Sequence, residues 1–316
     1  MKTFELNDGR SIPAFGLGTW KSSEGDVCQA VKEALRIGYR HIDAAWIYRN
    51  EQEVGRGIRE SVDAGFVTRD DIFVTSKLWN CFHAPSDVET GCQETLSALG
   101  LDYLDLYLMH WPVAFKPGVI LPENSKGFWA LSDVPLSKTF EAMLTLRDKG
   151  LVTSIGVSNF TASKLDQLIT DSGIVPAVNQ VELHPYHPQT DLLEYCQSKG
   201  IHLTAYSPLG SRDRPDSMKA SDEPPLLDND VVKATAVAEG LTPAQLLIAW
   251  AIARDTSVIP KSTNPRRIAE NLAATSHTLS DQAQLALESI TTRYRYVNPQ
   301  SWHIPDVTYD GSNFWA

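Results

Sequence analysis

Cysteine is scarce in this chain, and long apolar runs are missing. Only 4 cysteines occur among 316 residues, and none shows a C-x-x-C or other paired spacing. The sequence therefore predicts neither a disulfide framework nor redox chemistry at cysteine. No run approaches the ~20 apolar residues of a membrane-spanning helix, and the first residues lack the apolar core of a signal peptide. We expect a soluble, cytoplasmic protein that binds no membrane.

A basic surface is also missing. The formal net charge is −11 at pH 7, and no stretch concentrates lysine and arginine, so nucleic acid is not an expected partner. A chain of this length with 42% hydrophobic residues can bury a large core, either as one closed barrel or as two smaller domains. We expect a monomer whose partner is a small molecule.

Short runs rich in β-branched and aromatic residues alternate with longer amphipathic stretches, several of which end on glycine. This alternation is typical of parallel strands joined by helices. Eight such units predict an α/β protein with the fold of a (β/α)8 barrel. A doubly wound sheet is disfavoured because FGLGTW supplies G-x-G and not G-x-G-x-x-G. The predicted strands are 15–20, 41–45, 72–77, 103–110, 153–158, 177–183, 202–207 and 257–262.

Several segments fall outside the repeat. Turn chemistry at 7–9 predicts an N-terminal hairpin that plugs one end of the barrel. Two long stretches, 112–135 and 209–229, each follow a strand, so we expect them as loops on the face where such barrels carry their sites. The last segment is rich in aromatic residues and is expected to dock onto the body. One domain is predicted, with a hairpin cap (1–15), a barrel (16–290) and a C-terminal tail (291–316).

Four ionisable residues lie at or just beyond the ends of apolar runs in the first third of the chain: Asp43, Tyr48, Lys77 and His110. Each of them alone is more often a packing or solvated group than a catalyst. In a barrel, however, the ends of neighbouring strands converge on one rim, so these residues can meet. A phenol, an ammonium, a carboxylate and an imidazole together suit proton transfer beside a carbonyl group.

Three segments resemble, in order, the signatures of the aldo-keto reductase superfamily. They are 38–55, which runs from Gly38 through Asp43 and Glu51 to Gly55, then 155–160, and then 259–271. The resemblance covers nearly the whole chain. It implies a barrel enzyme that reduces aldehydes and some ketones to alcohols with NADPH, with Asp43, Tyr48, Lys77 and His110 as its catalytic residues.

The chemistry of carbonyl reduction agrees with these roles. A proton must reach the carbonyl oxygen, and a phenol with a pKa of about 10 is too weak an acid alone. We expect the ammonium of Lys77 to lower the pKa of Tyr48, the general acid, and Asp43 to hold Lys77 in place. His110 is expected to orient the carbonyl, to stabilise the developing oxyanion or to relay a proton. Because no side chain supplies a hydride, a cofactor must.

The strongest cofactor signal is VIPKSTNPRRIAEN. A strand is expected to end at Lys261 and Ser262, and a helix to begin near Asn264, so that free backbone N–H groups face an anion. Lys261 and Arg267 add two cations, which suits a ribose monophosphate and favours NADPH over NADH. The alternative is a basic helix start that only balances surface charge. By resemblance, the further cofactor contacts are Thr19, Trp20, Asp43, Ser158, Asn159, Gln180, Tyr206, Ser207, Pro208, Leu209, Ser211, Ser262, Thr263, Asn264, Glu270 and Asn271.

An aromatic cup is predicted for the substrate, suited to apolar carbonyl compounds. Phe128 and Trp302 are candidate walls, whereas Trp46 and Trp250 are expected to be ordinary core residues. No metal is expected, because His184 and His187 lack a third ligand. The predicted substrate residues are Trp20, Ile47, Tyr48, Trp79, His110 and Trp111.

Two other functions remain open from the sequence. A cofactor-binding regulatory subunit would keep the phosphate pocket and lose turnover, but the complete set of four ionisable residues argues against it. A Schiff-base lyase would use Lys77 as its nucleophile. The expected pairing of Lys77 with Tyr48 and Asp43 argues against a neutral lysine.

Overall fold

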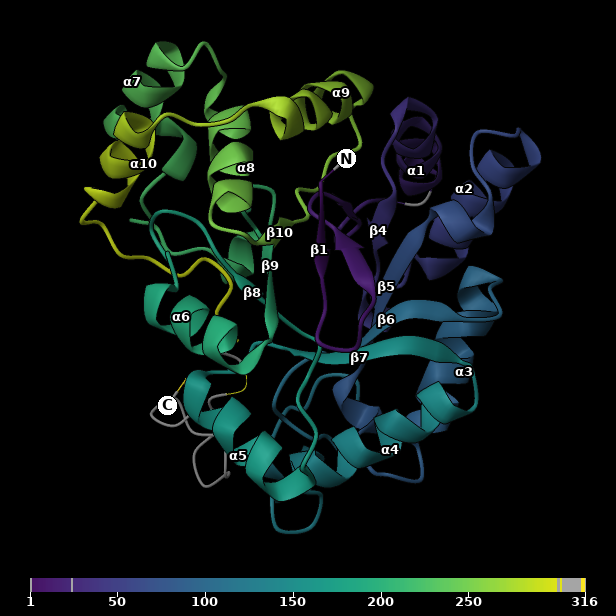
Figure 1. The fold of residues 1–316 in the computed structure, drawn as a ribbon. Coiled ribbons are helices and arrows are strands. Elements are labelled where there is room, and N and C mark those ends of the chain that lie inside the picture. The colour runs from purple at the N-terminus through teal and green to yellow at the C-terminus, as the bar shows by residue number, and fades with distance from the viewer. Residues whose placement is uncertain (1, 24, 300–301, 303–313, 316) are drawn as a thin grey trace.

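The sheet at the centre of the molecule consists of eight parallel strands in the order β10-β9-β8-β7-β6-β5-β4-β3, with helices around it (Figure 1). The structure is a computed structural model that describes residues 2–23, 25–299, 302 and 314–315. All eight predicted strands are present. They are β3 (Leu17–Gly18), β4 (His41–Asp43), β5 (Phe73–Leu78), β6 (Leu104–Met109), β7 (Val152–Ser158), β8 (Val178–Glu182), β9 (His202–Tyr206) and β10 (Ser257–Val258).

Isolated bridges close this sheet into a barrel at the β3–β10 seam. Phe15 pairs with Val258 and Gly18 with Lys261, both in parallel. Regular pairing in β3 and β10 is much shorter than the predicted runs 15–20 and 257–262. Pro260 has no N–H to donate, and a Cβ on Gly18 would lie 2.7 Å from the carbonyl oxygen of Ile259, so the seam is tight and irregular.

The predicted N-terminal hairpin is confirmed. Strands β1 (Thr3–Glu5) and β2 (Ser11–Pro13) pair in antiparallel fashion, and β1 crosses in front of the sheet in Figure 1. Leu6 and Ile12 pack with Phe73, Leu106 and Val178, which belong to the starts of barrel strands or to positions next to them. The hairpin therefore seals the N-terminal end of the barrel and leaves the opposite end for the loops.

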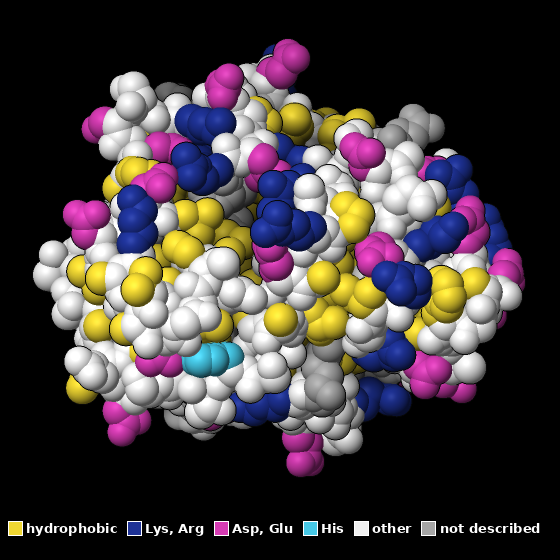
Figure 2. All heavy atoms as spheres, turned by 90° about the horizontal axis from the view of Figure 1, so that it is seen from above, with side chains coloured by type: hydrophobic (Ala, Val, Ile, Leu, Met, Phe, Trp, Pro, Cys, Tyr) yellow, Lys and Arg dark blue, Asp and Glu magenta, His cyan; other side chains and the backbone are white. Residues whose placement is uncertain are grey.

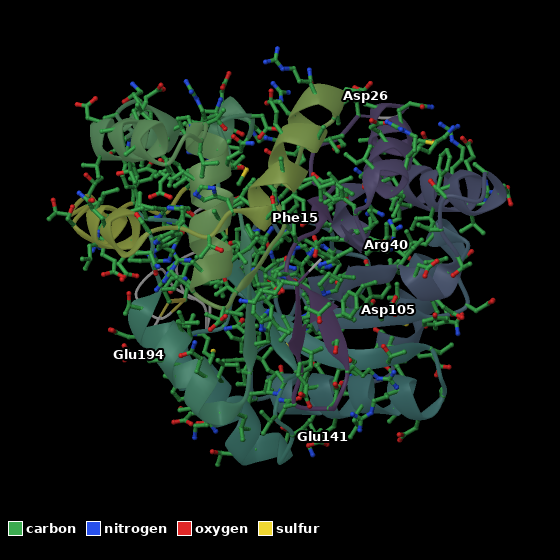
Figure 3. The ribbon with its side chains drawn as sticks, turned by 45° about the horizontal axis from the view of Figure 1, so that its top comes forward. Phe15, Asp26, Arg40, Asp105, Glu141 and Glu194 are labelled. Atoms are coloured by element: carbon green, nitrogen blue, oxygen red, sulfur yellow. The ribbon has the colours of Figure 1, made fainter. Side chains whose placement is uncertain are left out.

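Helices cover the outside of the barrel, as the amphipathic stretches predicted. Figure 3 shows Phe15 near the centre, whereas Glu141 and Glu194 lie on peripheral helices. Two helices, α7 and α8, stand between β9 and β10, so the strict alternation of one strand and one helix is broken there. The helices are α1 (Asp26–Ile37), α2 (Glu51–Asp63), α3 (Val88–Leu99), α4 (Leu136–Asp148), α5 (Ala162–Ser172), α6 (Thr190–Lys199), α7 (Asp230–Ala238), α8 (Pro243–Ala253), α9 (Pro265–Ala273) and α10 (Asp281–Glu288).

The two long loops contain no α-helix and no regular strand, only short 3-10 turns and an isolated bridge between Phe115 and Phe128. The 112–135 loop has one at Ser125–Gly127, and the 209–229 loop has turns at Asp216–Met218 and Leu226–Asp228. Further 3-10 turns at Trp46–Tyr48 and Asn80–Phe82 directly follow β4 and β5. The described part of the tail is docked, since Trp302 and Phe314 are 5% and 1% exposed. Residues 300–301, 303–313 and 316 of the predicted tail lie outside the described residues.

The structure shows how the cysteines, the apolar helices and the charged side chains are arranged. All four cysteines are free and buried. Within the described ranges, no single helix is long and apolar enough to cross a membrane, and α7 and α8 meet the criteria only as a pair bent by 84°. On the face shown in Figure 2, basic and acidic side chains are interspersed, so that face presents no field of one sign.

Candidate active site

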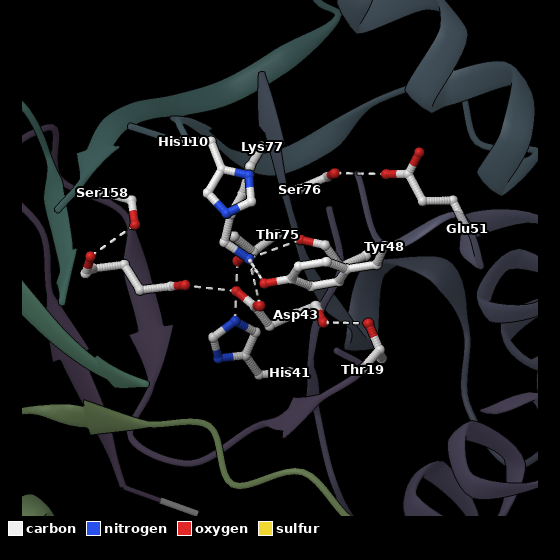
Figure 4. Close-up of polar contacts among 12 residues, drawn as sticks. Thr19, His41, Asp43, Tyr48, Glu51, Thr75, Ser76, Lys77, His110 and Ser158 are labelled. Carbon is white, nitrogen blue, oxygen red and sulfur yellow. Dashed lines mark hydrogen bonds and ion pairs between the residues drawn. The ribbon is translucent and has the colours of Figure 1, made fainter. Parts of the chain in front are cut away.

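Lys77 stands at the centre of the four ionisable residues singled out by the sequence (Figure 4). Its Nζ lies 2.5 Å from Oδ1 of Asp43, 2.9 Å from the carbonyl oxygen of Ala44 and 3.4 Å from the hydroxyl of Tyr48. The ring of His110 is 6.0 Å from that of Tyr48, edge to face. The structure thus brings all four residues together.

The positions of these residues follow from their strands. Asp43 ends β4 and Lys77 lies near the end of β5, which pairs with β4 in parallel, while His110 immediately follows β6. Tyr48 comes from the 3-10 turn after β4. Because the C-terminal ends of parallel strands reach the same rim, residues far apart in sequence meet there.

Both the side chain and the backbone of Asp43 accept hydrogen bonds. Its Oδ2 accepts a hydrogen bond from Nε2 of Gln180 at 2.7 Å, and its backbone oxygen accepts one from the hydroxyl of Thr19 at 2.8 Å. The side-chain nitrogen of Gln180 thus donates one hydrogen bond to Asp43, and its contact with a cofactor stays a prediction. Asp43 is 2% exposed and Lys77 1% exposed, so their ion pair is fully desolvated.

Burial controls the protonation of the site. It raises the pKa of Tyr48 well above its ordinary value, with the charge of Asp43 acting in the same direction. Burial also raises the pKa of Asp43 and lowers that of Lys77, and their mutual attraction opposes both changes. The expected lowering of the pKa of Tyr48 by Lys77 is not the dominant effect. Tyr48 is thus a protonated phenol at neutral pH, able to donate its proton.

His110 is a neutral imidazole. Burial, the ammonium of Lys77 and the nearby His83 hold its pKa well below the ordinary value. Its backbone oxygen accepts a hydrogen bond from Nδ2 of Asn159 at 3.0 Å, and its ring lies 5.2 Å from that of Trp79. Nδ1 of His110 is buried without a hydrogen-bond partner among the described residues. The ring is positioned by packing, beside the hydroxyl of Tyr48.

A cavity of about 1290 Å³ opens above this cluster. Two predicted site residues do not line this cavity. Lys77 lies beneath its wall, and Asn264 caps α9, where its side chain accepts a hydrogen bond from the backbone N–H of Arg267. The predicted residues that line it are Thr19, Trp20, Asp43, Ile47, Tyr48, Trp79, His110, Trp111, Ser158, Asn159, Gln180, Tyr206, Ser207, Pro208, Leu209, Ser211, Lys261, Ser262, Thr263, Arg267, Glu270 and Asn271.

One stretch of the cavity suits a nicotinamide ring and its amide. The hydroxyl of Tyr206 donates to Oδ1 of Asn159 at 2.8 Å, while Nδ2 of Asn159 lies 3.1 Å from Oγ of Ser158. Asn159 and Ser207 both adopt positive φ, at 67° and 48°. Strained backbone of this kind is often found at binding sites, and here it follows β7 and β9 directly.

The other end of the cavity suits a phosphate. Ser262 is only 5% exposed, and its Oγ accepts from the backbone N–H of Asn264. Arg267 approaches the same oxygen at 3.5 Å, and Lys261 is 2.8 Å from the carboxylate of Asp213. Cations and a helix N-terminus therefore converge where a dinucleotide would place its adenosine end. The donors along this cavity fit a nicotinamide dinucleotide.

The sequence did not single out three basic residues that line the cavity. Nζ of Lys21 donates to the backbone oxygen of Asp213, whose carboxylate pairs with Lys261, so Asp213 of the 209–229 loop lies between the two lysines. Burial lowers the pKa of Lys21 to about 8. Arg293 and Arg295 of the tail also line the cavity. Because these residues stand alone in loops and in the tail, no periodic pattern in the sequence marks them as site residues.

The aromatic cup occupies the remaining end of the cavity. Trp302 lines it and contacts Trp79 at 6.0 Å and Trp111 at 5.2 Å between ring centroids. Phe128 packs beneath the cup against Phe115 without lining the cavity. The cup is thus apolar and closed on one side by the tail.

Trp46 and Trp250 were both expected to be core residues, and only Trp250 is one. Trp250 is core, at 2% exposed, but Trp46 is half-buried at the surface, where its Nε1 donates to Glu94. Nε2 of His184 donates to Oε1 of Glu182 at 2.8 Å. Within the described ranges, no group of three potential metal ligands occurs.

Comparison with known proteins gives one consistent result. Residues 14–291 match the aldo/keto reductase family. An aldo/keto reductase of Synechocystis sp. is 47% identical over 315 residues, covering 100% of this chain and 96% of that protein. Human aldo-keto reductase family 1 member A1 is 44% identical over 97% of this chain and 92% of its own length. The structure of an aldose reductase from Schistosoma japonicum superposes with a TM-score of 0.86 at 41% identity, covering 95% of this chain and 96% of that one.

Proposed function

Because the chain belongs to the aldo/keto reductase family, we propose that it reduces aldehydes and some ketones to alcohols with NADPH. The observation that carries this proposal is the hydroxyl of Tyr48 at the cavity wall, 3.4 Å from Nζ of Lys77, whose other partner is Asp43. Tyr48 is the general acid in this proposal.

The proton step follows from these contacts. A carbonyl oxygen placed between Tyr48 and His110 receives the phenolic proton as negative charge develops on it. Lys77 then stabilises the phenolate that remains, and Asp43 keeps Lys77 protonated and in place. The neutral imidazole of His110 orients the carbonyl or donates a hydrogen bond to it. Burial keeps the pKa of this residue low, so the imidazole beside the carbonyl is neutral.

A bound dihydronicotinamide supplies the hydride that the carbonyl carbon receives. Ser158, Asn159 and Tyr206 would hold its amide and ring, and Lys261 and Arg267 its ribose phosphate. The preference for NADPH rests on those two cations. We propose that the protein acts as a monomer on a small carbonyl compound.

The alternatives are less well supported. A lyase needs a neutral lysine with free access to substrate, but Lys77 is 1% exposed and its Nζ is surrounded by Asp43, Ala44 and Tyr48. A regulatory subunit without turnover would have no use for a desolvated ion pair beside a phenol.

The test is the loss of NADPH absorbance with a panel of aldehydes. We expect turnover by the wild-type protein and a decrease in kcat of at least about 100-fold for Tyr48→Phe, since general acid catalysis contributes 10²–10⁴-fold. NADPH affinity should stay near the wild-type value, because the substitution removes one hydroxyl from the catalytic end of the cavity. An unchanged kcat would show that Tyr48 is not the acid, and borohydride trapping of an adduct at Lys77 would favour the lyase.

A further inference from the structure

A buried carboxylate outside the proton-transfer site holds the C-terminal tail. Glu182 ends β8 and is 0% exposed. Its Oε1 lies 2.6 Å from the backbone nitrogen of Tyr296 and 2.8 Å from Nε2 of His184, and its Oε2 lies 2.7 Å from the backbone nitrogen of Val297. Burial alone would raise the pKa of Glu182, but the donors from His184, Tyr296 and Val297 lower it. The charged carboxylate therefore fixes the tail at the rim.

The side chain of Tyr296 points from this anchor toward the 209–229 loop. Its hydroxyl donates to the carbonyl oxygen of Pro224 at 2.5 Å. The guanidinium of Arg214 lies 5.1 Å from the centre of its ring. A Cβ on Gly210 would lie 3.2 Å from the ring, so the loop packs tightly against Tyr296 at this position. Tyr296 thus supports the loop at three places.

Arg214 organises the loop that rests on this ring. It is 2% exposed and donates to the carbonyl oxygens of Ser211 and Met218, and its Nη2 pairs with Glu223. The loop has no regular strand or helix, so these contacts set its shape. Movement of Tyr296 would therefore be transmitted to the parts of the loop that line the cavity, which include Ser211 and Asp213.

The chain beyond Tyr296 lines the other end of the cavity. Val297, Asn298 and Pro299 face it, and Trp302 packs against Trp111 in the aromatic cup. Tyr296 thus stands between the loop over the proposed phosphate end and the tail that walls the cup. Its backbone is held by Glu182 and its hydroxyl by the loop.

We propose that Glu182 and Tyr296 form a latch that couples retention of the cofactor to the shape of the carbonyl pocket. Tyr296 is a positioning residue in this proposal, which rests on the proposed function of the cavity. When the 209–229 loop closes on the cofactor, the latch holds Val297 and Trp302 at the wall of the pocket. Coupling of this kind is reciprocal, so docking of Trp302 in the pocket also favours the closed loop.

The experiment uses Tyr296→Phe, which keeps the ring and removes only the hydrogen bond to Pro224. Stopped-flow fluorescence should show NADPH release faster by about 3- to 10-fold, the effect of one hydrogen bond. The KM of a bulky aromatic aldehyde should rise by a similar factor, while that of propanal stays unchanged. Tyr195→Phe is the matched control, since it removes a tyrosine hydrogen bond to Asp166 outside the cavity. We expect it to leave all three values unchanged.

A second readout needs no turnover. Trypsin cleaves after Arg293 and Arg295, both next to the latch, and NADPH should protect these bonds in the wild-type protein. In Tyr296→Phe and Glu182→Gln that protection should decrease, while Tyr195→Phe retains it. If the protein reduces no carbonyl compound, the proposed function fails, but this protection still tests the latch.

Two results would overturn the proposal. One is faster NADPH release in Tyr296→Phe with an unchanged ratio of the two KM values, which would separate the loop from the pocket. The other is equal NADPH protection of the tail in all variants. A Trp302→Ala background should abolish the effect of Tyr296→Phe on the KM ratio, and persistence of that effect would also contradict a route through the tail.

Discussion

At the scale of single residues, burial decides the charge state of the candidate site. The sequence predicted which residues meet, because Asp43, Lys77 and His110 each stand at a strand end. It did not predict that burial raises the pKa of Tyr48, since desolvation depends on neighbours from several strands. Glu51 is the clearest such case outside the tetrad. The sequence marks Glu51 only as part of a signature. In the structure its side chain is 5% exposed, and its Oε1 accepts a hydrogen bond from Oγ of Ser76, the neighbour of Lys77, at 2.6 Å.

The first residue-scale prediction concerns this carboxyl group. Burial raises the pKa of Glu51 from 4.5 to about 7, while the hydroxyls of Ser76 and Thr95 and the charges of Lys77 and Arg49 act in the opposite direction. Between pH 4.5 and 7 the unfolded chain loses this proton and the folded protein keeps it. The free energy of unfolding should therefore fall as pH rises through this range, by up to about 3 kcal/mol from this group.

Glu51→Gln removes the titration, so its unfolding free energy should fall less than that of the wild type between pH 4.5 and 7.5. Urea unfolding across this range measures the difference. Parallel curves for the two proteins would show that Glu51 ionises with an ordinary pKa in the folded state.

At the scale of elements, the start of α9 illustrates what local sequence can predict. The sequence predicted Asn264 as the N-terminal cap of this helix and Pro265 in its first turn, and the structure has both. Sequence spacing could not show that Arg267 lines the cavity while its neighbour Arg266 does not line it and pairs with Glu270 at 2.8 Å. The direction of each side chain around a helix start depends on how the helix docks on the barrel.

The element-scale prediction uses these two arginines as a matched pair. Arg267→Ala should raise the KM for NADPH by about 10-fold or more and leave the KM for NADH nearly unchanged, because a charge-assisted hydrogen bond to phosphate contributes roughly 1.5–3 kcal/mol. Arg266→Ala should change neither value by more than about 2-fold, since exposed ion pairs contribute little. Initial rates with each cofactor provide the measurement. Equal effects of Arg267→Ala on both cofactors would rule out a phosphate pocket at α9.

At the scale of the whole molecule, closure of the barrel places both ends of the cavity. The seam between β3 and β10 joins Thr19, beside Asp43, to the segment that ends at Lys261. The number and order of the strands could be predicted from their alternation with helices. The short, irregular pairing at the seam could not, because it depends on the approach of Gly18 to the carbonyl oxygen of Ile259.

The prediction at this scale is that Gly18→Ala strains the seam. A Cβ at 2.7 Å from a backbone oxygen forces the two strands apart, and overpacking of this kind typically costs about 1–3 kcal/mol. The midpoint of urea unfolding should fall, and NADPH should bind more weakly because Lys261 moves with the strand. Val237→Ala, at an 81% exposed site on α7, should change neither quantity. NADPH affinity equal to that of the wild type would show that the seam does not position the cofactor pocket.

The sequence by itself determined the eight strands, the hairpin and the four ionisable residues of the site. These features depend on local patterns: alternation, turn chemistry and the position of polar residues at strand ends. Only the tertiary structure decided that Gln180 binds Asp43, that the 209–229 loop is held between Lys21 and Lys261, and that Glu182 anchors the tail. These contacts join segments up to 192 residues apart, and nothing in either segment specifies its partner until the barrel closes.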